Sequence, residues 1–192
     1  PDLLGTANGR LNADLDAIAA YLAVGVRAPI SPVGAHQPRV KEGRALFQTA
    51  GCQNCHGGAN WTTSVLDYTP PAAANDVVDA QLVRFLCRVG TFDANLFADG
   101  EGNEIRANAL VAGAGANVQA RGALGFNVPS LISVFASAPY LHSGTAPTRG
   151  DVLDNVTHRS SGSGGVDMLT AATDRRAVVR FLQSIDRDTE PF

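Results

Sequence analysis

Apolar residues recur at the spacing of an α-helix in several short stretches of the chain. Residues 11–24 place four apolar side chains on one helical face: Leu15, Ile18, Ala19 and Leu22. Residues 38–50 carry a second apolar stripe: Val40, Ala45, Leu46 and Phe47. The same spacing predicts helices over three further segments: residues 77–87, 148–157 and 173–185. No stretch alternates apolar and polar residues in the manner of a strand, so the pattern predicts an all-α fold.

Two of these helices carry additional local signals. Thr148, followed by Asp151 three residues later, resembles a capping box at the start of a helix. In residues 173–185, four apolar side chains are expected to point into the core: Val178, Phe181, Leu182 and Ile185. Both signals place helices in the C-terminal quarter of the chain.

The N-terminal part of the chain is expected to be distinct from the rest. Residues 27–38 hold three prolines and no helical periodicity, which is typical of a linker. Residues 1–37 are therefore predicted to be a helix and linker: the remnant of a preceding domain, an arm on the main domain, or the first helix of a single domain. Residues 38–192 form the main domain, in which residues 90–126 predict a long irregular excursion that wraps a surface.

The composition is that of a globular protein. The chain has 192 residues, 45% of them hydrophobic and 17% charged, which is enough apolar material for a core. A formal net charge of -3 argues against nucleic-acid binding, which requires a basic surface. No apolar run approaches the roughly 20 residues of a membrane-spanning helix. With 20 glycines and 10 prolines, long loops between short helices are expected.

The strongest chemical signal is the run Cys52-Gln53-Asn54-Cys55-His56, a C-x-x-C-H motif of the kind that attaches a c-type haem. Two thiols three positions apart lie on the same side of one helical turn, so both can reach the vinyl groups of a porphyrin. His56 is then placed to bind the iron. A zinc site would need a second ligand pair and a thiol–disulfide motif would need an α/β pattern, and neither is present. The motif predicts one covalent haem c.

Haem attachment of this kind takes place outside the cytoplasm, so the protein is expected to be periplasmic or extracellular. The N-terminus shows no export signal. The expectation is that a signal was removed or that the chain is a piece of a longer protein.

The residues alone leave the sixth iron ligand open among Met168, His158 and His142. Methionine would raise the reduction potential and a second histidine would lower it. Trp61 follows the haem motif closely and either packs near the porphyrin or belongs to the core. Cys87, in an apolar stretch, is expected to be a buried free thiol.

Four runs together resemble the haem domains of bacterial di-haem cytochrome c peroxidases and MauG-like proteins. They are EGRALF at 42–47, AGCQNCH at 50–56, NVPSL at 127–131 and APYLHSG at 138–144. The resemblance covers residues 41–192 and implies a cytochrome c-like helical domain wrapped around the haem.

The resemblance also ranks the candidate ligands. It implies a distal ligand near residues 156–158, which favours His158 over Met168, and it implies that His142 contacts a haem propionate or a group next to the iron ligands. Ser143 stands where the family has aspartate, and the chain has one haem motif where family members have two.

A single haem favours the electron-supplying role, with the iron cycling between Fe(III) and Fe(II). We therefore expect an electron-transfer domain that meets a redox partner protein or partner haem domain, as a component of a larger assembly. The alternative is a peroxidase with a five-coordinate iron, in which His142 helps to cleave peroxide. A third alternative is a domain that mainly docks subunits, with residues 90–125 as the contact segment.

Overall fold

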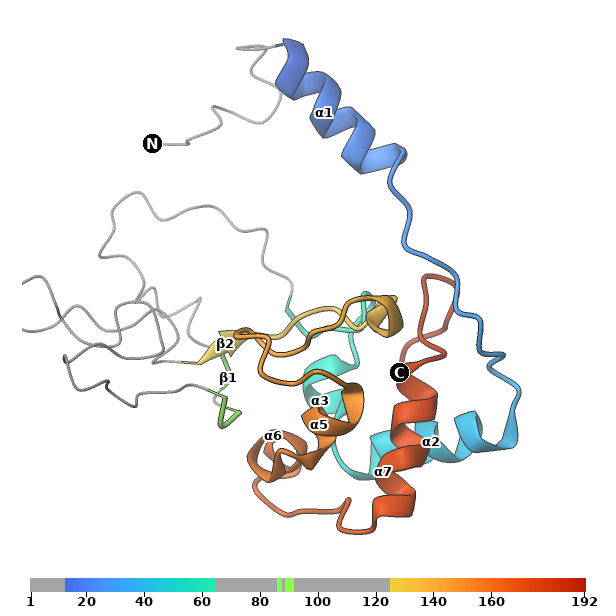
Figure 1. The fold of residues 1–192 in the computed structure, drawn as a ribbon, viewed down its shortest axis with the longest axis vertical. Helices are drawn as coiled ribbons and strands as arrows, with labels where there is room; N and C mark the ends of the chain where they lie inside the picture. Colours follow the sequence, from blue (N-terminus) through green and yellow to red (C-terminus); the bar gives the residue numbers. More distant parts are fainter. Residues whose placement is uncertain (1–12, 65–85, 88, 92–124) are drawn as a thin grey trace, which may run out of the picture.

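A computed structural model describes residues 13–64, 86–87, 89–91 and 125–192 (Figure 1). Its helices are α1 (Ala13–Val24), α2 (Pro38–Thr49), α3 (Gln53–His56), the 3-10 helix η1 (Val134–Ala136), α5 (Arg149–Asp154), α6 (Val156–Ser161) and α7 (Ala172–Leu182). The strands are β1 (Leu86–Cys87) and β2 (Phe126–Asn127), which pair antiparallel. The described residues are mostly helical, which confirms the expected helical character, while the short strand pair was not predicted.

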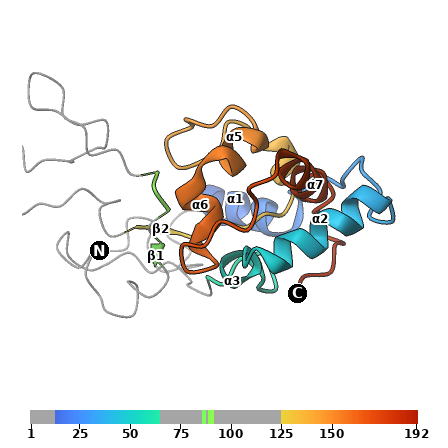
Figure 2. The same ribbon diagram turned by 90° about the horizontal axis from the view of Figure 1, so that it is seen from below.

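The body of the molecule is built on the contact between α2 and α7, which lie side by side in both ribbon views (Figures 1 and 2). Gly43 of α2 meets the backbone of α7 so closely that a Cβ there would overlap the carbonyl oxygen of Ala177. Small residues permit such an approach of two helix backbones, because no side chain separates them. The four residues of 173–185 that were predicted to face inward are all buried, which confirms that part of the pattern.

An aromatic cluster fills the core beside this helix pair. The rings of Phe47, Trp61 and Phe181 meet edge to face, with centroids 5.3 to 6.4 Å apart. Phe192 stacks on Phe47, and the guanidinium of Arg44 lies 4.3 Å from the centre of the Phe192 ring. Edge-to-face and stacked pairs of this kind add to the hydrophobic gain of burial. The cluster fixes the C-terminal end of α2, where the C-x-x-C-H run begins.

The single helix predicted over residues 148–157 is wrong, because the structure divides it into α5 and α6. Asn155 between them has extended backbone (φ -71°, ψ 103°), and its side chain accepts a hydrogen bond from the backbone N–H of His158 at 3.0 Å. An asparagine in this position is a strong N-cap and starts a new helix. At the start of α5, the capping box between Thr148 and Asp151 is confirmed in both of its hydrogen bonds.

The helix predicted over residues 77–87 is wrong at residues 86 and 87, the part of this segment that the structure describes. Its last two residues form strand β1, with Cys87 paired to Phe126. Gly125 explains the close pairing, because at φ +117° it brings its backbone against that of Cys87, where a Cβ would overlap. Residues 77–85, and residues 92–124 of the expected excursion, lie outside the described residues.

Helix α1 stands away from the body in Figure 1. Its predicted apolar face is exposed, with Leu15 at 45%, Ile18 at 54% and Leu22 at 59%. The chain joins the body further along: the Ser133 hydroxyl donates to the carbonyl of Pro29 at 2.7 Å, and Ser31 donates to Gln183 and Asp186, which follow α7. Within the described ranges, no helix has both the length and the apolar character needed to cross a bilayer.

Replacing Gly43 with alanine should strongly destabilise the fold, because the new methyl group has no room against the backbone of α7. Overpacking typically costs about 1–3 kcal/mol, and a clash with backbone belongs at or above the upper end. The free energy of unfolding, measured in urea, checks this. Gly34→Ala is the matched control, since a Cβ at Gly34 meets nothing within 4 Å. Equal stability of the two variants would contradict the close contact.

Candidate functional site

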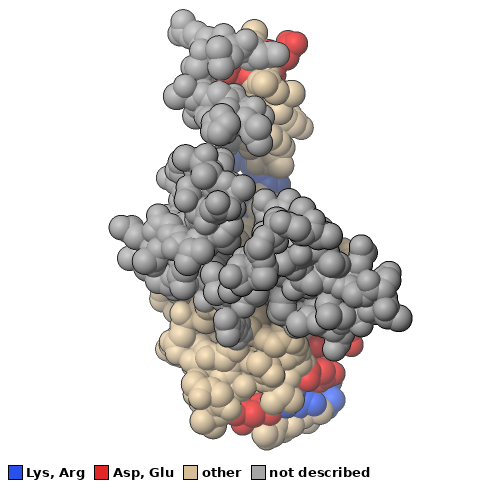
Figure 3. Space-filling model, turned by 90° about the vertical axis from the view of Figure 1, so that its left-hand side faces the viewer, with Lys and Arg blue, Asp and Glu red and all other residues tan. Residues whose placement is uncertain are grey.

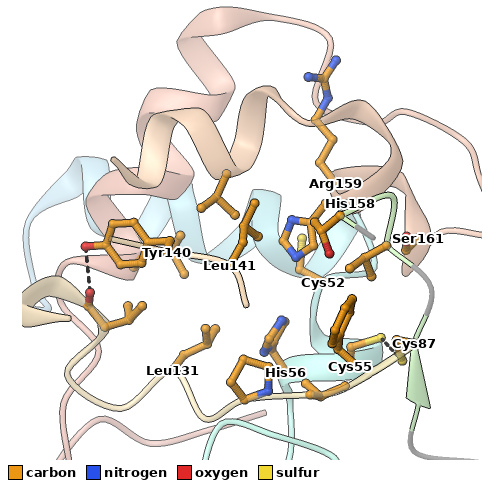
Figure 4. A pocket seen from close by; sticks show the side chains of 18 of the residues that line it. Cys52, Cys55, His56, Cys87, Leu131, Tyr140, Leu141, His158, Arg159 and Ser161 are labelled. Atoms are coloured by element: carbon orange, nitrogen blue, oxygen red, sulfur yellow. Dashed lines mark hydrogen bonds between the residues drawn. The ribbon is translucent and has the colours of Figure 1, made fainter. Parts of the chain in front are cut away.

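A cavity of about 480 Å³ opens between the α2–α3 turn, the segment 126–142 and the α5–α6 pair. This volume lies in the range of about 300–1,000 Å³ that is usual for small-molecule and cofactor pockets. Its wall is mainly apolar and also carries titratable side chains: Cys52, Cys55, His56, Cys87, Tyr140, His142, Arg149, His158 and Arg159. Figure 4 labels all of these except His142 and Arg149. The C-x-x-C-H run and the predicted partner histidines therefore line one cavity.

The turn between α2 and α3 sets the position of the C-x-x-C-H run. Gly51 adopts φ +73°, the left-handed conformation in which helices commonly end. A Cβ at Gly51 would overlap the backbone of Gly162, at the end of α6. The side-chain amide of Asn54 also donates to the Gly162 carbonyl at 2.8 Å. These contacts hold α3 against α6 and bring together residues about a hundred positions apart in the sequence.

His56 and His158 face one another across the cavity. Their ring centroids are 6.5 Å apart and the ring planes are inclined by 66°. Figure 4 shows the two imidazoles pointing toward each other from α3 and α6. The N-cap bond from Asn155 fixes the first turn of α6 and with it the direction of His158.

Both imidazoles are held in their neutral form. Burial and, to a smaller extent, the nearby His158 lower the pKa of His56, the carbonyls of Pro129 and Trp61 act in the opposite direction, and the net result is a pKa of about 4. Burial also lowers the pKa of His158, partly opposed by the carbonyl of Val152. Neutral imidazole is the form that binds metal ions, so neither ring has to lose a proton at neutral pH in order to bind one.

The two rings fit an iron held between them. An imidazole nitrogen binds a transition metal at about 2 Å, so a metal between two such nitrogens separates the ring centres by about 6 Å. The Nδ1 atoms of both His56 and His158 are buried and lack a hydrogen bond of standard geometry. Backbone carbonyls nevertheless act on both rings, those of Pro129 and Trp61 on His56 and that of Val152 on His158.

Comparisons with protein-family models, with curated proteins and with solved structures find no match to this chain. The site is therefore interpreted from its own residues. Over the part of the chain that the structure describes, no group of three or more His, Cys, Asp or Glu side chains is arranged to hold a metal ion.

Three thiols lie at one end of the cavity. Cys52 and Cys55 are partly buried, and burial raises the pKa of each thiol to about 11. Cys87 was expected to be a buried free thiol in a helical stretch. It is free, as expected, but it is only partly buried and lies on β1, with its Sγ 4.0 Å from the Sγ of Cys55. Nothing in the local sequence of Cys87 signals this contact, because it depends on a strand pair with residues about forty positions away.

Of the other predicted site residues, His142 lines the cavity, whereas Trp61 and Met168 do not. His142 lines the cavity and its ring stacks on Phe126, with centroids 3.7 Å apart. Trp61 is not part of the cavity wall: it is 1% exposed in the aromatic core, and its indole N–H donates to the Thr189 carbonyl at 3.1 Å. The core alternative for Trp61 is therefore the one that the structure supports. Met168 is 47% exposed and is also absent from the wall.

Two arginines on the cavity wall were not singled out from the sequence. Arg149 donates to the carbonyl of Phe135 and to the hydroxyl of Tyr140, while its Nε is buried and has no hydrogen-bond partner. Arg159 forms a two-point ion pair with Asp167. Both side chains are held by long-range or loop contacts, which no local sequence pattern reveals.

Replacing Asp167 with asparagine should destabilise the protein at neutral pH and have little effect in strong acid. The hydrogen bond from Arg159 lowers the pKa of Asp167 from 3.8 to about 2. Because the folded pKa is below the unfolded one, the stabilisation is fully present above about pH 4 and is lost as the pH falls through about 2. Unfolding in urea at pH 7 and at pH 2 measures this.

The control for this series is Asp188→Asn, since Asp188 is largely exposed and its carboxylate lies 3.6 Å from Arg187. An exposed pair of this kind contributes little. An Asp167→Asn variant as stable as the parent protein at pH 7, or a deficit that persists below pH 2, would contradict the role given to the ion pair.

Proposed function

We propose that this chain binds one haem through thioether bonds to Cys52 and Cys55 and functions as an electron-transfer domain. The observation that carries the proposal is the pair His56 and His158, which face each other across a cavity that also exposes both thiols. A C-x-x-C-H run beside two facing neutral imidazoles matches the donor set of a six-coordinate c-type haem.

Each of these residues has a separate task. The thiols of Cys52 and Cys55 add to the two vinyl groups of the porphyrin, which prevents its dissociation. The imidazoles of His56 and His158 bind the iron from its two faces. When bound, haem supplies a one-electron Fe(III)/Fe(II) couple.

The rest of the cavity wall shapes the environment of the redox centre. Apolar side chains from three segments, including Leu131, Leu141 and Leu153, keep water away from the ring. Burial and axial ligation are two of the means by which a protein sets the potential of a haem. A ligand pair of two histidines favours a lower potential than a histidine–methionine pair.

The geometry favours electron transfer over the peroxidase alternative. Peroxide reduction requires an open position on the iron, and a second histidine ligand, His158, would occupy it. The ring of His142, the candidate acid–base group, is stacked against Phe126. We therefore propose electron transfer.

Electron transfer requires a partner, which we propose to be a redox protein or another haem domain in the periplasm or outside the cell. On the part of the face in Figure 3 that the structure describes, charged side chains lie at the lower right edge of the body and again near the top of the view.

The covalent haem is tested on protein exported in a host that attaches c-type haem. We expect the pigment to stay with the polypeptide in acid–acetone, and the reduced pyridine complex to show the spectrum of a haem with two thioether bonds. Cys55→Ser should shift this spectrum toward that of a single thioether. Release of all pigment into the solvent would contradict the proposal.

Replacing His158 with alanine should convert the resting iron from low spin to high spin, because one of its two axial ligands is lost. Met168→Leu, the matched control at the other candidate ligand, should leave the low-spin optical spectrum unchanged. The parent protein should not change its spectrum on addition of peroxide, whereas the His158→Ala variant should. The opposite pattern in the two variants would identify Met168 as the ligand.

A further inference from the structure

The cavity holds one nucleophilic side chain that the proposed function does not use. Haem attachment through a C-x-x-C-H run requires two thiols, and Cys87 is a third on the same wall. Its sulfur lies 4.0 Å from that of Cys55 although the two residues are 32 positions apart in the sequence (Figure 4). All three cysteines are free.

The backbone of Cys87 is fixed near Cys55 by strand pairing. Cys87 pairs with Phe126, and Gly125 brings the neighbouring backbone so close that a Cβ would overlap it. A disulfide has an S–S length of about 2.05 Å, so the two sulfurs need to approach by only about 2 Å. A change of side-chain rotamer provides a displacement of this size.

We propose that Cys55 and Cys87 form a disulfide in the haem-free chain, so that Cys87 controls whether Cys55 is available for haem attachment. The oxidant is a disulfide, either of small-molecule or of protein origin. In the first exchange, one of the two thiols loses its proton and attacks that disulfide, which forms a mixed disulfide and releases a thiolate that takes up the proton. In the second exchange, the other cysteine attacks the mixed disulfide, closes the Cys55–Cys87 bond and releases the second thiol.

The effect on haem attachment rests on the proposed function, whereas the formation of the disulfide does not. A sulfur in a disulfide cannot add to a vinyl group, so oxidation withholds one of the two attachment points. Reduction by two thiols restores Cys55 and makes the site competent again. Cys87 would thus make haem attachment depend on the thiol–disulfide balance of the compartment in which the chain folds.

The disulfide is tested on the haem-free full-length chain, oxidised with glutathione disulfide, alkylated and digested with trypsin. Cleavage after Arg84 and Arg88 isolates Cys87 in the tetrapeptide FLCR and leaves Cys52 and Cys55 together in the peptide 45–84. Mass spectrometry of the unreduced digest is expected to find FLCR linked to the peptide 45–84. The link should be lost in Cys55→Ser and kept in the matched control Cys52→Ser.

Two results would overturn the proposal. One is recovery of FLCR with an alkylated Cys87 beside a peptide 45–84 that contains an internal disulfide. The other is a link that survives in Cys55→Ser and disappears in Cys52→Ser. Neither result depends on haem, so the failure of this inference is distinguishable from the failure of the proposed function.

A second measurement tests the consequence. In exported protein, Cys87→Ser should bind more haem per chain than the parent protein under oxidising conditions, and the difference should disappear when a dithiol reductant is supplied. Equal haem content of both proteins under both conditions would overturn the controlling role of Cys87. Absence of haem from both would overturn the proposed function and leave the disulfide mapping valid.

Discussion

The close contact of α2 with α7 is the constraint on which the site depends. Gly43 allows the two helix backbones to approach, and the rings of Phe47 and Phe181 meet directly beside this crossing. The end of α2 is thereby fixed, and the backbone N–H of Cys52 bonds to the carbonyl of Phe47 at 3.1 Å. The packing of the core therefore sets the position of the attachment thiols. A looser helix pair would leave the C-x-x-C-H run without a defined direction.

Burial of two histidines at the cavity costs free energy of folding. His56 and His158 are largely removed from water, and their Nδ1 atoms make no hydrogen bond of standard geometry, although backbone carbonyls lie near both rings. The aromatic core and the ion pair of Arg159 with Asp167 offset this cost in the described body. Two polar rings that face each other in a mainly apolar cavity are difficult to explain as packing, since apolar residues would fill the space without penalty. Ligation of the proposed haem iron would give the arrangement a physical reason.

The sequence predicted best those structural features that depend on a single helix or motif. The helices around Phe47 and Phe181, the capping box at Thr148 and the C-x-x-C-H run were all predicted, because each depends on spacing within a few residues. The contact between Cys55 and Cys87 could not be predicted, since it arises from strands that are set by distant pairing and by the backbone of Gly125. What covers the apolar face of α1 was left open among three alternatives, because amphipathic spacing indicates an apolar face without indicating its partner.

The break at Asn155 shows how a local departure from the helical pattern places a functional side chain. Leu153 and His158 both line the cavity. In one continuous helix, residues five positions apart differ in direction by about 140°, so both could not have faced the same cavity. The extended backbone of Asn155 resets the direction, and its side chain then caps the new helix that carries His158. Periodicity predicted the helical content of this segment correctly but not the break, because the break is set by the cap and not by the spacing of apolar residues. The asparagine was therefore the informative residue, since its preference for caps over helix interiors is the local signal for the break.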